Sequence, residues 1–281
     1  MPAATAGRVR EALSAATDAF TAAGVDTPRL DAEVLLAEAT GWDRAKFAAE
    51  PEASLDPPSA RRFGEMVRRR IRREPVAYIV GRKAFRNIEL AVDGRVLIPR
   101  PESELLVDIA LELKPQVVLD VGTGSGAIAL AVADELPDCE VIATDTSEDA
   151  LELARENAER LGLADRVAFE LGTVPAGRRF DLVLANLPYV REDELDSLQP
   201  EIREYEPRRA VLAGADGLEA IAVVAAAAYA ALTENGALAL EVGAGQAGAV
   251  AELLVDLGFM QVEGRQDLAQ IPRVVLGRMG A

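Results

Sequence analysis

The chain has 281 residues, of which 50% are hydrophobic and 27% charged, so there is room for one large domain or two smaller ones with an ordinary core. A net charge of −17 argues against a protein whose main function is to bind the phosphate backbone of nucleic acids. One cysteine and no histidine exclude an intramolecular disulfide, the common zinc sites and any mechanism with a histidine base, and we expect no metal.

The sequence gives no sign of a secretory signal or a membrane span. The first 20 residues lack an apolar core, and the most apolar run, 221–232, is 12 residues long. A membrane-spanning helix needs about 20 apolar residues, so this run predicts a buried helix. We therefore expect a cytoplasmic protein that does not associate with membranes.

Residues 1–75 are predicted to form a small all-helical domain. Apolar residues recur with a helical period up to Gly24, and further helices are expected over 31–40 and 59–73. This segment holds 12 basic and 12 acidic residues, whereas the rest of the chain carries the whole net charge. The difference favours a separate role, and we assign the domain to substrate docking. The arginine-rich stretch 61–73 is interpreted first as a solvated, salt-bridged helix face, with contact to an acidic partner or to nucleic acid as alternatives.

Residues 76–100 are predicted to be a connector with a β-hairpin, with strands near 76–80 and 88–92. Residues 101–281 alternate between strand and helix. This alternation predicts an α/β fold in which helices cover both faces of a mostly parallel sheet. The last two strands are expected to form a hairpin. The expected strands of this domain are 117–121, 141–144, 167–171, 181–185, 237–242, 260–264 and 274–276.

A glycine-rich turn over 122–126 joins the first of these strands to a helix. Glycines permit unusual backbone torsions and let a ligand approach the main chain, while the following helix aims free N–H groups at that ligand. Asp145 ends the next strand, where a carboxylate can accept hydrogen bonds from a ribose. The turn lacks the lysine of a P-loop, but a dinucleotide, S-adenosylmethionine and a purely structural role stay open. The candidate cofactor-binding residues are Gly122, Thr123, Gly124, Ser125, Gly126 and Asp145.

The fourth strand of this domain runs into the tetrad Asn186-Leu187-Pro188-Tyr189. Its carboxyl end is expected on the ligand side of the sheet. The amide of Asn186 carries a carbonyl acceptor that can orient an amide or amino N–H, and Tyr189 can cover a planar group. Pro188 stiffens the turn. An ordinary turn after a strand is the alternative, but its place after a glycine turn and a ribose carboxylate favours methyl transfer to nitrogen.

The tetrad resembles the Asn-Pro-Pro-Tyr signature of amino-methylating enzymes, with Leu187 in place of the first proline. Residues 97–104, which read Leu-Ile-Pro-Arg-Pro-Glu-Ser-Glu, resemble a segment of the HemK/PrmC family. This family comprises protein-(glutamine-N5) methyltransferases that act on peptide chain release factors. Residues 74–81, 212–218 and 241–243 match as well, and the resemblance extends over nearly the whole chain.

This resemblance implies a Rossmann-like methyltransferase sheet with a final antiparallel strand, and S-adenosylmethionine as the cofactor. It also implies that the substrate is the glutamine of the Gly-Gly-Gln loop in class 1 release factors. Leu187 can supply the main-chain carbonyl for which the family uses proline. The candidate residues are then Asn186, Pro188 and Tyr189 for catalysis, Thr173 and Asn186 beside the cofactor, and Asn186, Leu187, Pro188, Tyr189 and Arg100 for the substrate.

Other functions stay open at this point. The same pocket suits a glutamine of a ribosomal protein, and N6-adenine methyltransferases of nucleic acid share the type of tetrad. The acidic C-terminal region lacks a basic face, so no stable nucleic-acid binding is expected. A nicotinamide-dependent oxidoreductase lacks a recognisable proton donor after the turn, and a non-catalytic binding module is the remaining alternative.

Overall fold

The structure is a computed structural model that describes residues 7–280, which form two compact units. Among the described residues, the helical unit consists of 7–81 together with 199–205, and the sheet unit consists of 82–198 and 206–280. Segment 199–205 therefore lies far along the chain and still folds with residues 7–81. None of the helices among residues 7–280 combines the length and the apolar character that crossing a membrane requires.

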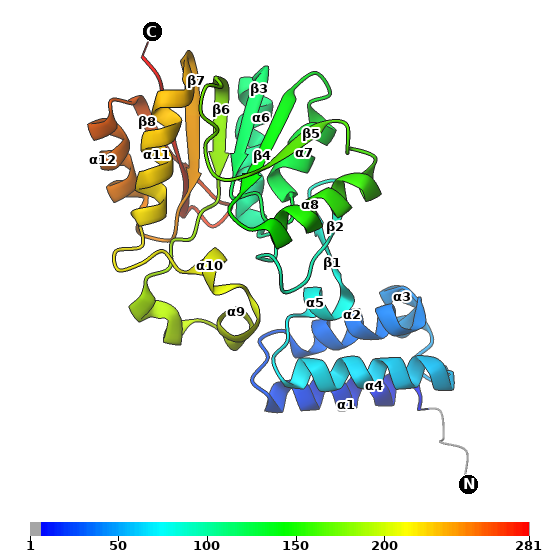
Figure 1. Ribbon diagram of the computed structural model, residues 1–281. Coiled ribbons are helices and arrows are strands. Elements are labelled where there is room, and N and C mark those ends of the chain that lie inside the picture. Colours follow the sequence, from blue (N-terminus) through cyan, green and yellow to red (C-terminus); the bar gives the residue numbers. More distant parts are fainter. Residues whose placement is uncertain (1–6, 281) are drawn as a thin grey trace. The chain divides into compact units, whose positions relative to one another are not determined.

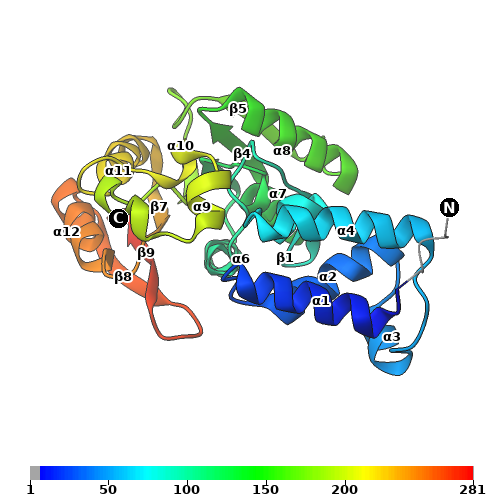
Figure 2. The ribbon, with the colours of Figure 1, turned by 90° about the horizontal axis from the view of Figure 1, so that it is seen from below.

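Three helices build the core of the helical unit. α1 (Val9–Ala22) and α4 (Pro57–Ile71) pack against α2 (Pro28–Thr40), as Figures 1 and 2 show. The predicted helices are thus confirmed, and Gly41 ends α2 with left-handed backbone at φ 71°. The residues buried by α1 are those with the helical period, Val9, Leu13, Ala16 and Phe20. The remaining helices of the unit are α3 (Arg44–Ala49), α5 (Val76–Val80) and α9 (Pro200–Tyr205).

The prediction of a strand over 76–80 is wrong, because these residues form the short helix α5. Gly81 ends the helix with left-handed backbone at φ 79°. β-branched residues favour strands only weakly, and here the burial of Ile79 in the core of the helical unit decides the conformation. The hairpin of the connector pairs β1 (Arg82–Phe85) with β2 (Ile88–Ala91), so the sequence predicts only its second strand correctly.

A network of ion pairs around the buried Arg70 connects α4 with α9 inside the helical unit. The Arg70 guanidinium lies 2.7 Å from Asp31 and 2.7 Å from Glu201. Arg73 lies 2.6 Å from the second oxygen of the same Glu201 carboxylate. Burial by itself raises the pKa of Glu201, but the hydrogen bonds from Arg73 and Arg70 outweigh it and hold this pKa below its ordinary value. Glu201 therefore stays ionised and fixes α9 to the unit.

The arginine-rich stretch 61–73 is in part a set of internal ion pairs. Arg62 pairs with Glu38, and Arg69 pairs with Glu74 at 2.5 Å. This agrees with the expected salt-bridged helix face, with the correction that Arg70 is buried in the helical unit rather than solvated.

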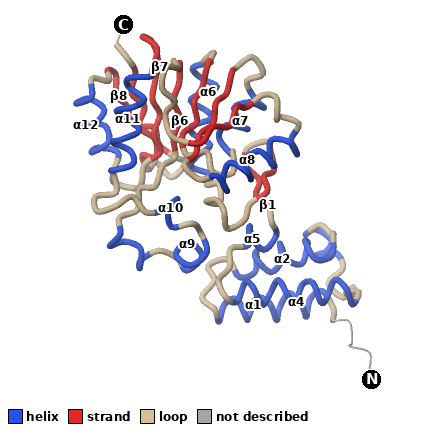
Figure 3. Tube along the Cα trace, in the orientation of Figure 1, coloured by secondary structure: helices blue, strands red, loops and turns tan. Residues whose placement is uncertain are grey.

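The sheet unit is built on seven strands in the order β5-β4-β3-β6-β7-β9-β8, drawn in red in Figure 3. Pairing is parallel from β5 to β7, whereas β9 runs antiparallel to both β7 and β8. The mostly parallel sheet and the closing hairpin are thus confirmed. The strands are β3 (Val117–Val121), β4 (Glu140–Asp145), β5 (Val167–Leu171), β6 (Phe180–Ala185), β7 (Leu232–Glu241), β8 (Met260–Gln266) and β9 (Pro272–Arg278).

Helices cover both faces of this sheet (Figure 1). Alternate residues of the strands enter two apolar cores, one on each face, which explains why the strands read as continuous apolar runs. α6 (Glu104–Leu113) and α7 (Ala127–Glu135) pack on one core, and α11 (Glu219–Ala231) and α12 (Ala247–Leu257) pack on the other. α8 (Glu148–Leu161) packs against β4 and β5. The short helices of the unit are η1 (Pro101–Ser103), η2 (Glu192–Ser197) and α10 (Arg208–Val211).

Candidate active site

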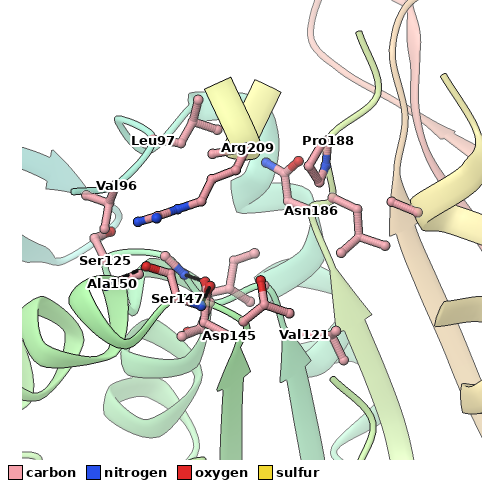
Figure 4. A pocket seen from close by; sticks show the side chains of 18 of the residues that line it. Val96, Leu97, Val121, Ser125, Asp145, Ser147, Ala150, Asn186, Pro188 and Arg209 are labelled. Carbon is pink, nitrogen blue, oxygen red and sulfur yellow. Dashed lines mark hydrogen bonds between the residues drawn. The ribbon is translucent and has the colours of Figure 1, made fainter. Parts of the chain in front are cut away.

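A cavity of about 540 Å³ opens at the carboxyl ends of β3, β4 and β6. Ligands of parallel sheets bind on this side, and the volume suits a small organic molecule. Figure 4 shows Asp145 near the strand ends, Ser125 and Val96 on one side, and Asn186 with Pro188 on the other. The predicted site residues that line the cavity are Arg100, Gly122, Thr123, Gly124, Ser125, Asp145, Thr173, Asn186, Leu187 and Pro188.

The glycine-rich turn has backbone torsions that glycine adopts readily. Gly122, Gly124 and Gly126 have φ angles of 77°, 56° and 84°. A Cβ on Gly124 would meet nothing within 4 Å, so the turn is open to a ligand there. A Cβ on Gly126 would lie 2.8 Å from the Leu130 side chain. Gly126 therefore serves the close packing of α7 and is not part of the cavity wall.

The carboxylate of Asp145 holds the turn from the neighbouring strand. Its Oδ2 accepts a hydrogen bond from the Gly124 N–H at 2.9 Å, and its Oδ1 accepts one from the Ser147 N–H at 2.9 Å. Each carboxylate oxygen has a second lone pair, so Asp145 keeps acceptors for a ligand in the cavity. Free acceptors beside an open glycine turn are what the ribose of an adenosine cofactor requires.

A second carboxylate, Asp120, lies beneath the turn and is fully buried. Its Oδ2 accepts hydrogen bonds from the Thr123 hydroxyl at 2.7 Å and from the Ala129 N–H at 3.2 Å. Its Oδ1 has no hydrogen-bond partner among residues 7–280. Burial raises the pKa of Asp120 to about 7, and the negative charge of Asp145 adds to the rise. In the sequence, Asp120 stands out as an acidic residue inside an apolar strand.

The tetrad forms the opposite wall of the cavity and packs directly against the glycine turn. A Cβ on Gly122 would lie 3.3 Å from the Leu187 side chain and 3.5 Å from the Asn186 carbonyl oxygen. A side chain at position 122 would therefore press on the tetrad. The turn and the tetrad, far apart in the sequence, thus form one pocket.

Tyr189 lies beside the cavity and is not part of its wall. A Cβ on Gly243 would lie 3.0 Å from the Tyr189 ring, and the Tyr189 carbonyl accepts a hydrogen bond from Gln246 Nε2 at 2.9 Å. Burial raises the pKa of the Tyr189 phenol, and the nearby Glu241 contributes. The phenol is therefore neutral at physiological pH.

Two residues without an assigned role in the sequence analysis support the tetrad, Ser103 by direct contact and Glu241 through Ser103. Asn186 Nδ2 donates a hydrogen bond to Ser103 Oγ at 3.0 Å, and the Ser103 hydroxyl donates one to Glu241 Oε2 at 2.6 Å. Ser103 and Glu241 are both buried. Burial raises the pKa of Glu241 to about 7. In the sequence, Ser103 and Glu241 belong to segments 97–104 and 241–243, which resemble the HemK/PrmC family.

Arg100 lines the cavity but is already paired. It contacts Glu206 at 2.6 Å, and the Glu206 side chain is only 1% exposed. Burial raises the pKa of Glu206, and the Arg100 charge opposes the rise. A second arginine, Arg209 on α10, extends into the cavity (Figure 4).

Comparison with solved structures supports the fold. A methyltransferase from Pyrococcus furiosus matches with a TM-score of 0.52 and 20% identity, over 68% of this chain and 89% of that one. The hMettl16 catalytic domain matches with a TM-score of 0.55 and 15% identity, over 67% of this chain and 74% of that one. Residues 113–228 also match the family model described as a methyltransferase domain.

Comparison with curated proteins identifies the family. Residues 11–81 match the family model of the PrmC N-terminal domain. Release factor glutamine methyltransferases from Caulobacter vibrioides (40% identical, 95% of each chain), Geobacter sulfurreducens (41%, 92% of each) and Cereibacter sphaeroides (41%, 98% of this chain and 99% of that one) align over nearly the whole length. The fold and these matches define a methyltransferase that uses S-adenosylmethionine. The chain belongs to the family of release factor glutamine methyltransferases.

Proposed function

We propose that this chain methylates the side-chain amide nitrogen of the glutamine in the Gly-Gly-Gln loop of class 1 peptide chain release factors. The observation that carries the proposal is the Asn186 amide in the cavity wall. Its Nδ2 is engaged by Ser103, and among residues 7–280 its Oδ1 has no hydrogen-bond donor. The names of the relatives support the substrate. We expect the reaction in the cytoplasm, where protein synthesis supplies release factors.

The cofactor half of the site is assigned to the turn over 122–126, to Asp145 and to Thr173 at the edge of the adenine pocket. S-adenosylmethionine, when bound, supplies an electrophilic methyl group on a positively charged sulfur. Asp145 accepts hydrogen bonds from the ribose hydroxyls, for which its second lone pairs are available. The open face at Gly124 lets the cofactor lie close to the main chain.

The substrate half is assigned to the tetrad. Asn186 Oδ1 and the Leu187 main-chain carbonyl accept the two N–H groups of a primary amide and so hold its nitrogen toward the methyl group. Pro188 stiffens the chain directly after them. We assign Tyr189 to covering the plane of the substrate amide. Because Tyr189 lies beside Gly243 and outside the cavity wall, the substrate must reach past that wall.

Arg100 is assigned to the substrate as well. Its guanidinium has five N–H donors, and the contact with Glu206 leaves several of them for main-chain carbonyls of the entering loop. Glycines beside the target glutamine would let that loop enter without side-chain clashes.

Catalysis is assigned to positioning and to the exclusion of water rather than to proton abstraction. An amide nitrogen is a weak nucleophile, so its geometry relative to the methyl group controls the rate. The sequence has no histidine, and Glu241, the buried carboxylate behind the tetrad, is engaged by Ser103. The side chains thus hold the reacting nitrogen instead of removing its proton first.

The helical unit is assigned to docking the intact release factor. The chain leaves the tetrad at Tyr189 and enters the helical unit at 199–205, where Glu201 is held by Arg70 and Arg73. A partner bound to the helical unit is therefore linked to the tetrad through a short chain segment.

The test offers purified class 1 release factor, ribosomal proteins and nucleic acid in parallel to the full chain with radiolabelled S-adenosylmethionine. We expect label in the release factor alone, mapped by mass spectrometry to the Gly-Gly-Gln glutamine. A release factor in which this glutamine is changed to alanine is the control and should take up no label. Label in a ribosomal protein or in adenine, with the release factor unmodified, would reject the proposed substrate.

A further inference from the structure

Two buried polar side chains, Ser103 and Glu241, form a line with the half-buried Asn186 of the tetrad. Asn186 follows β6, Ser103 ends η1, and Glu241 ends β7. Ala185 pairs with Leu240 in the parallel ladder, so the next residues, Asn186 and Glu241, lie at the same level of the sheet. Ser103 lies between them, 3.0 Å from Asn186 Nδ2 and 2.6 Å from Glu241 Oε2.

The donors and acceptors of this line have only one consistent arrangement when Glu241 is ionised. A carboxylate only accepts hydrogen bonds, so the single hydroxyl proton of Ser103 must point to Glu241. The Ser103 oxygen is then left as an acceptor, and only the NH₂ end of the Asn186 amide can donate to it. The carbonyl end, Oδ1, is therefore directed away from Ser103.

A neutral Glu241 would remove this constraint. A protonated carboxyl can donate to the Ser103 oxygen, and the Ser103 hydroxyl can then donate to a flipped Asn186 amide. The flipped amide presents its NH₂ group to the target nitrogen, which also carries N–H donors. Two donors facing each other do not bind, so the flipped state is unproductive.

We propose that Ser103 and Glu241 are positioning residues that hold the Asn186 amide with its carbonyl oxygen toward the target nitrogen. This inference rests on the proposed function only for its effect on turnover, because the orientation of the amide exists without substrate. The charge of Glu241 selects the productive orientation, and Ser103 transmits that selection.

The surroundings of Glu241 make its charge sensitive to pH near neutrality. The pKa of Glu241 is raised to about 7, mainly by burial and to a smaller extent by the charge of the nearby Glu102. The hydrogen bond from Ser103 and the charges of Arg273 and Arg100 act in the opposite direction. The fraction of productive enzyme should therefore increase as the pH rises through about 7.

The first test measures the amide itself, without substrate. The side-chain NH₂ signals of Asn186 are assigned in nitrogen-15 spectra by their loss in Asn186→Ala and are followed from pH 5.5 to 8.5, a window of about 1.5 units on each side of the pKa of about 7. We expect a titration with a midpoint near 7 that disappears in Glu241→Gln. Glu234→Gln is the matched control, because Glu234 lies on the same strand and is exposed. Signals that do not titrate, or that titrate equally in Glu241→Gln, would overturn the inference.

The second test measures turnover. For the wild type we expect kcat to rise with pH through about 7, and for Glu241→Gln we expect this rise to vanish. At pH 8 kcat of the variant should be lower by about tenfold to a hundredfold, as small displacements of a reacting group cost rate on this scale. Affinity for S-adenosylmethionine, measured by calorimetry, should be unchanged. A merely structural role would instead lower kcat equally at every pH.

A double variant separates positioning from direct catalysis. Ser103→Ala should slow the wild type about as much as Glu241→Gln does, but it should have no further effect in the Asn186→Ala background. Additive effects would contradict transmission through Asn186. Failure of the wild type to methylate release factor would reject the proposed function alone, since the titration of the Asn186 signals stands without it.

Discussion

The two units of the molecule differ in how they compensate their carboxylates, with the exception of Glu206 in the sheet unit, which pairs with Arg100. In the helical unit, Asp31 and Glu201 each contact Arg70. In the sheet unit, Asp120 and Glu241 are buried against hydroxyls and backbone N–H groups, and the pKa of each is raised to about 7. A buried charge without a counter-charge costs folding free energy. Paired charges thus stabilise the helical unit, whereas Asp120 and Glu241, whose pKa values are raised, lie next to the candidate active site.

Turnover should depend on the polar side chain of Asn186 in the cavity wall. Asn186→Ala should lower kcat on release factor about 100-fold or more, because the target nitrogen loses its orientation. Calorimetry should show unchanged affinity for S-adenosylmethionine. Asn87→Ala, an exposed change in the turn between β1 and β2, is the control and should keep full activity. Near-normal turnover of Asn186→Ala would reduce the tetrad to an ordinary turn.

The paired charges of the helical unit are tested by Glu201→Gln. The neutral amide weakens two charged hydrogen bonds and leaves buried Arg70 less compensated, so the unit should lose about 1.5–3 kcal/mol of stability. The single tryptophan, Trp42, lies in this unit, so its fluorescence during denaturation reports the unit selectively. Glu204→Gln, which removes only a pair with half-exposed Arg203, should change little. Equal effects of the two changes would show that burial of the pair is unimportant.

The variant Asp145→Ala tests whether the carboxylate of Asp145 binds the cofactor. Loss of charged hydrogen bonds to a ribose is worth about 1.5–3 kcal/mol, so affinity for S-adenosylmethionine should fall at least about tenfold. Asp165→Ala, in an exposed loop of the same unit, serves as the control. Unchanged affinity in calorimetric titration of Asp145→Ala would move the cofactor elsewhere.

The two units should also differ in their dependence on pH. The folded pKa of Asp120 lies above its unfolded value, so at pH 6 the folded chain binds a proton that the unfolded chain has released. Stability of the sheet unit should therefore fall as pH rises, by about 1 kcal/mol between pH 6 and 7 for this group. Calorimetric unfolding of Asp120→Asn should show a smaller slope. An identical slope in the variant would contradict the raised pKa.

The helical unit should show the opposite sign. The folded pKa of Glu201 is lowered by Arg73 and Arg70, so its contribution to stability is present at neutral pH. It should be lost only as pH falls below the ordinary carboxyl range, through the folded pKa. Trp42 fluorescence at acid pH measures this loss, and Glu201→Gln should remove it.

The sequence predicts those parts of the molecule that depend on local pattern. The helical period of α1, the glycine turn at 122–126 and the strand that ends at Ala185 are each contained in a short segment, and the structure has them where expected. The strand expected over 76–80 is an exception. There a run of β-branched residues misleads, because burial in the helical core and the glycine after it decide the conformation.

The site is less predictable because its supporting contacts join distant segments. Ser103 and Asn186 are separated by 83 residues, and Ser103 and Glu241 by 138. No periodicity or spacing brings such residues together before the sheet is known. The same holds for Glu201, whose partners Arg70 and Arg73 precede it by more than 120 residues.

The return of 199–205 to the helical unit has a consequence for biosynthesis. Although most of that unit is made from the first 81 residues, Glu201 emerges from the ribosome long after α4 has left it. Until then Arg70 has Asp31 as a carboxylate partner but lacks Glu201. The nascent helical unit is therefore left incomplete through the synthesis of four strands of the sheet, β3 to β6, and it closes only when α9 arrives. The helical unit thus receives its last segment after β3 to β6 of the sheet unit have been made and before β7 to β9.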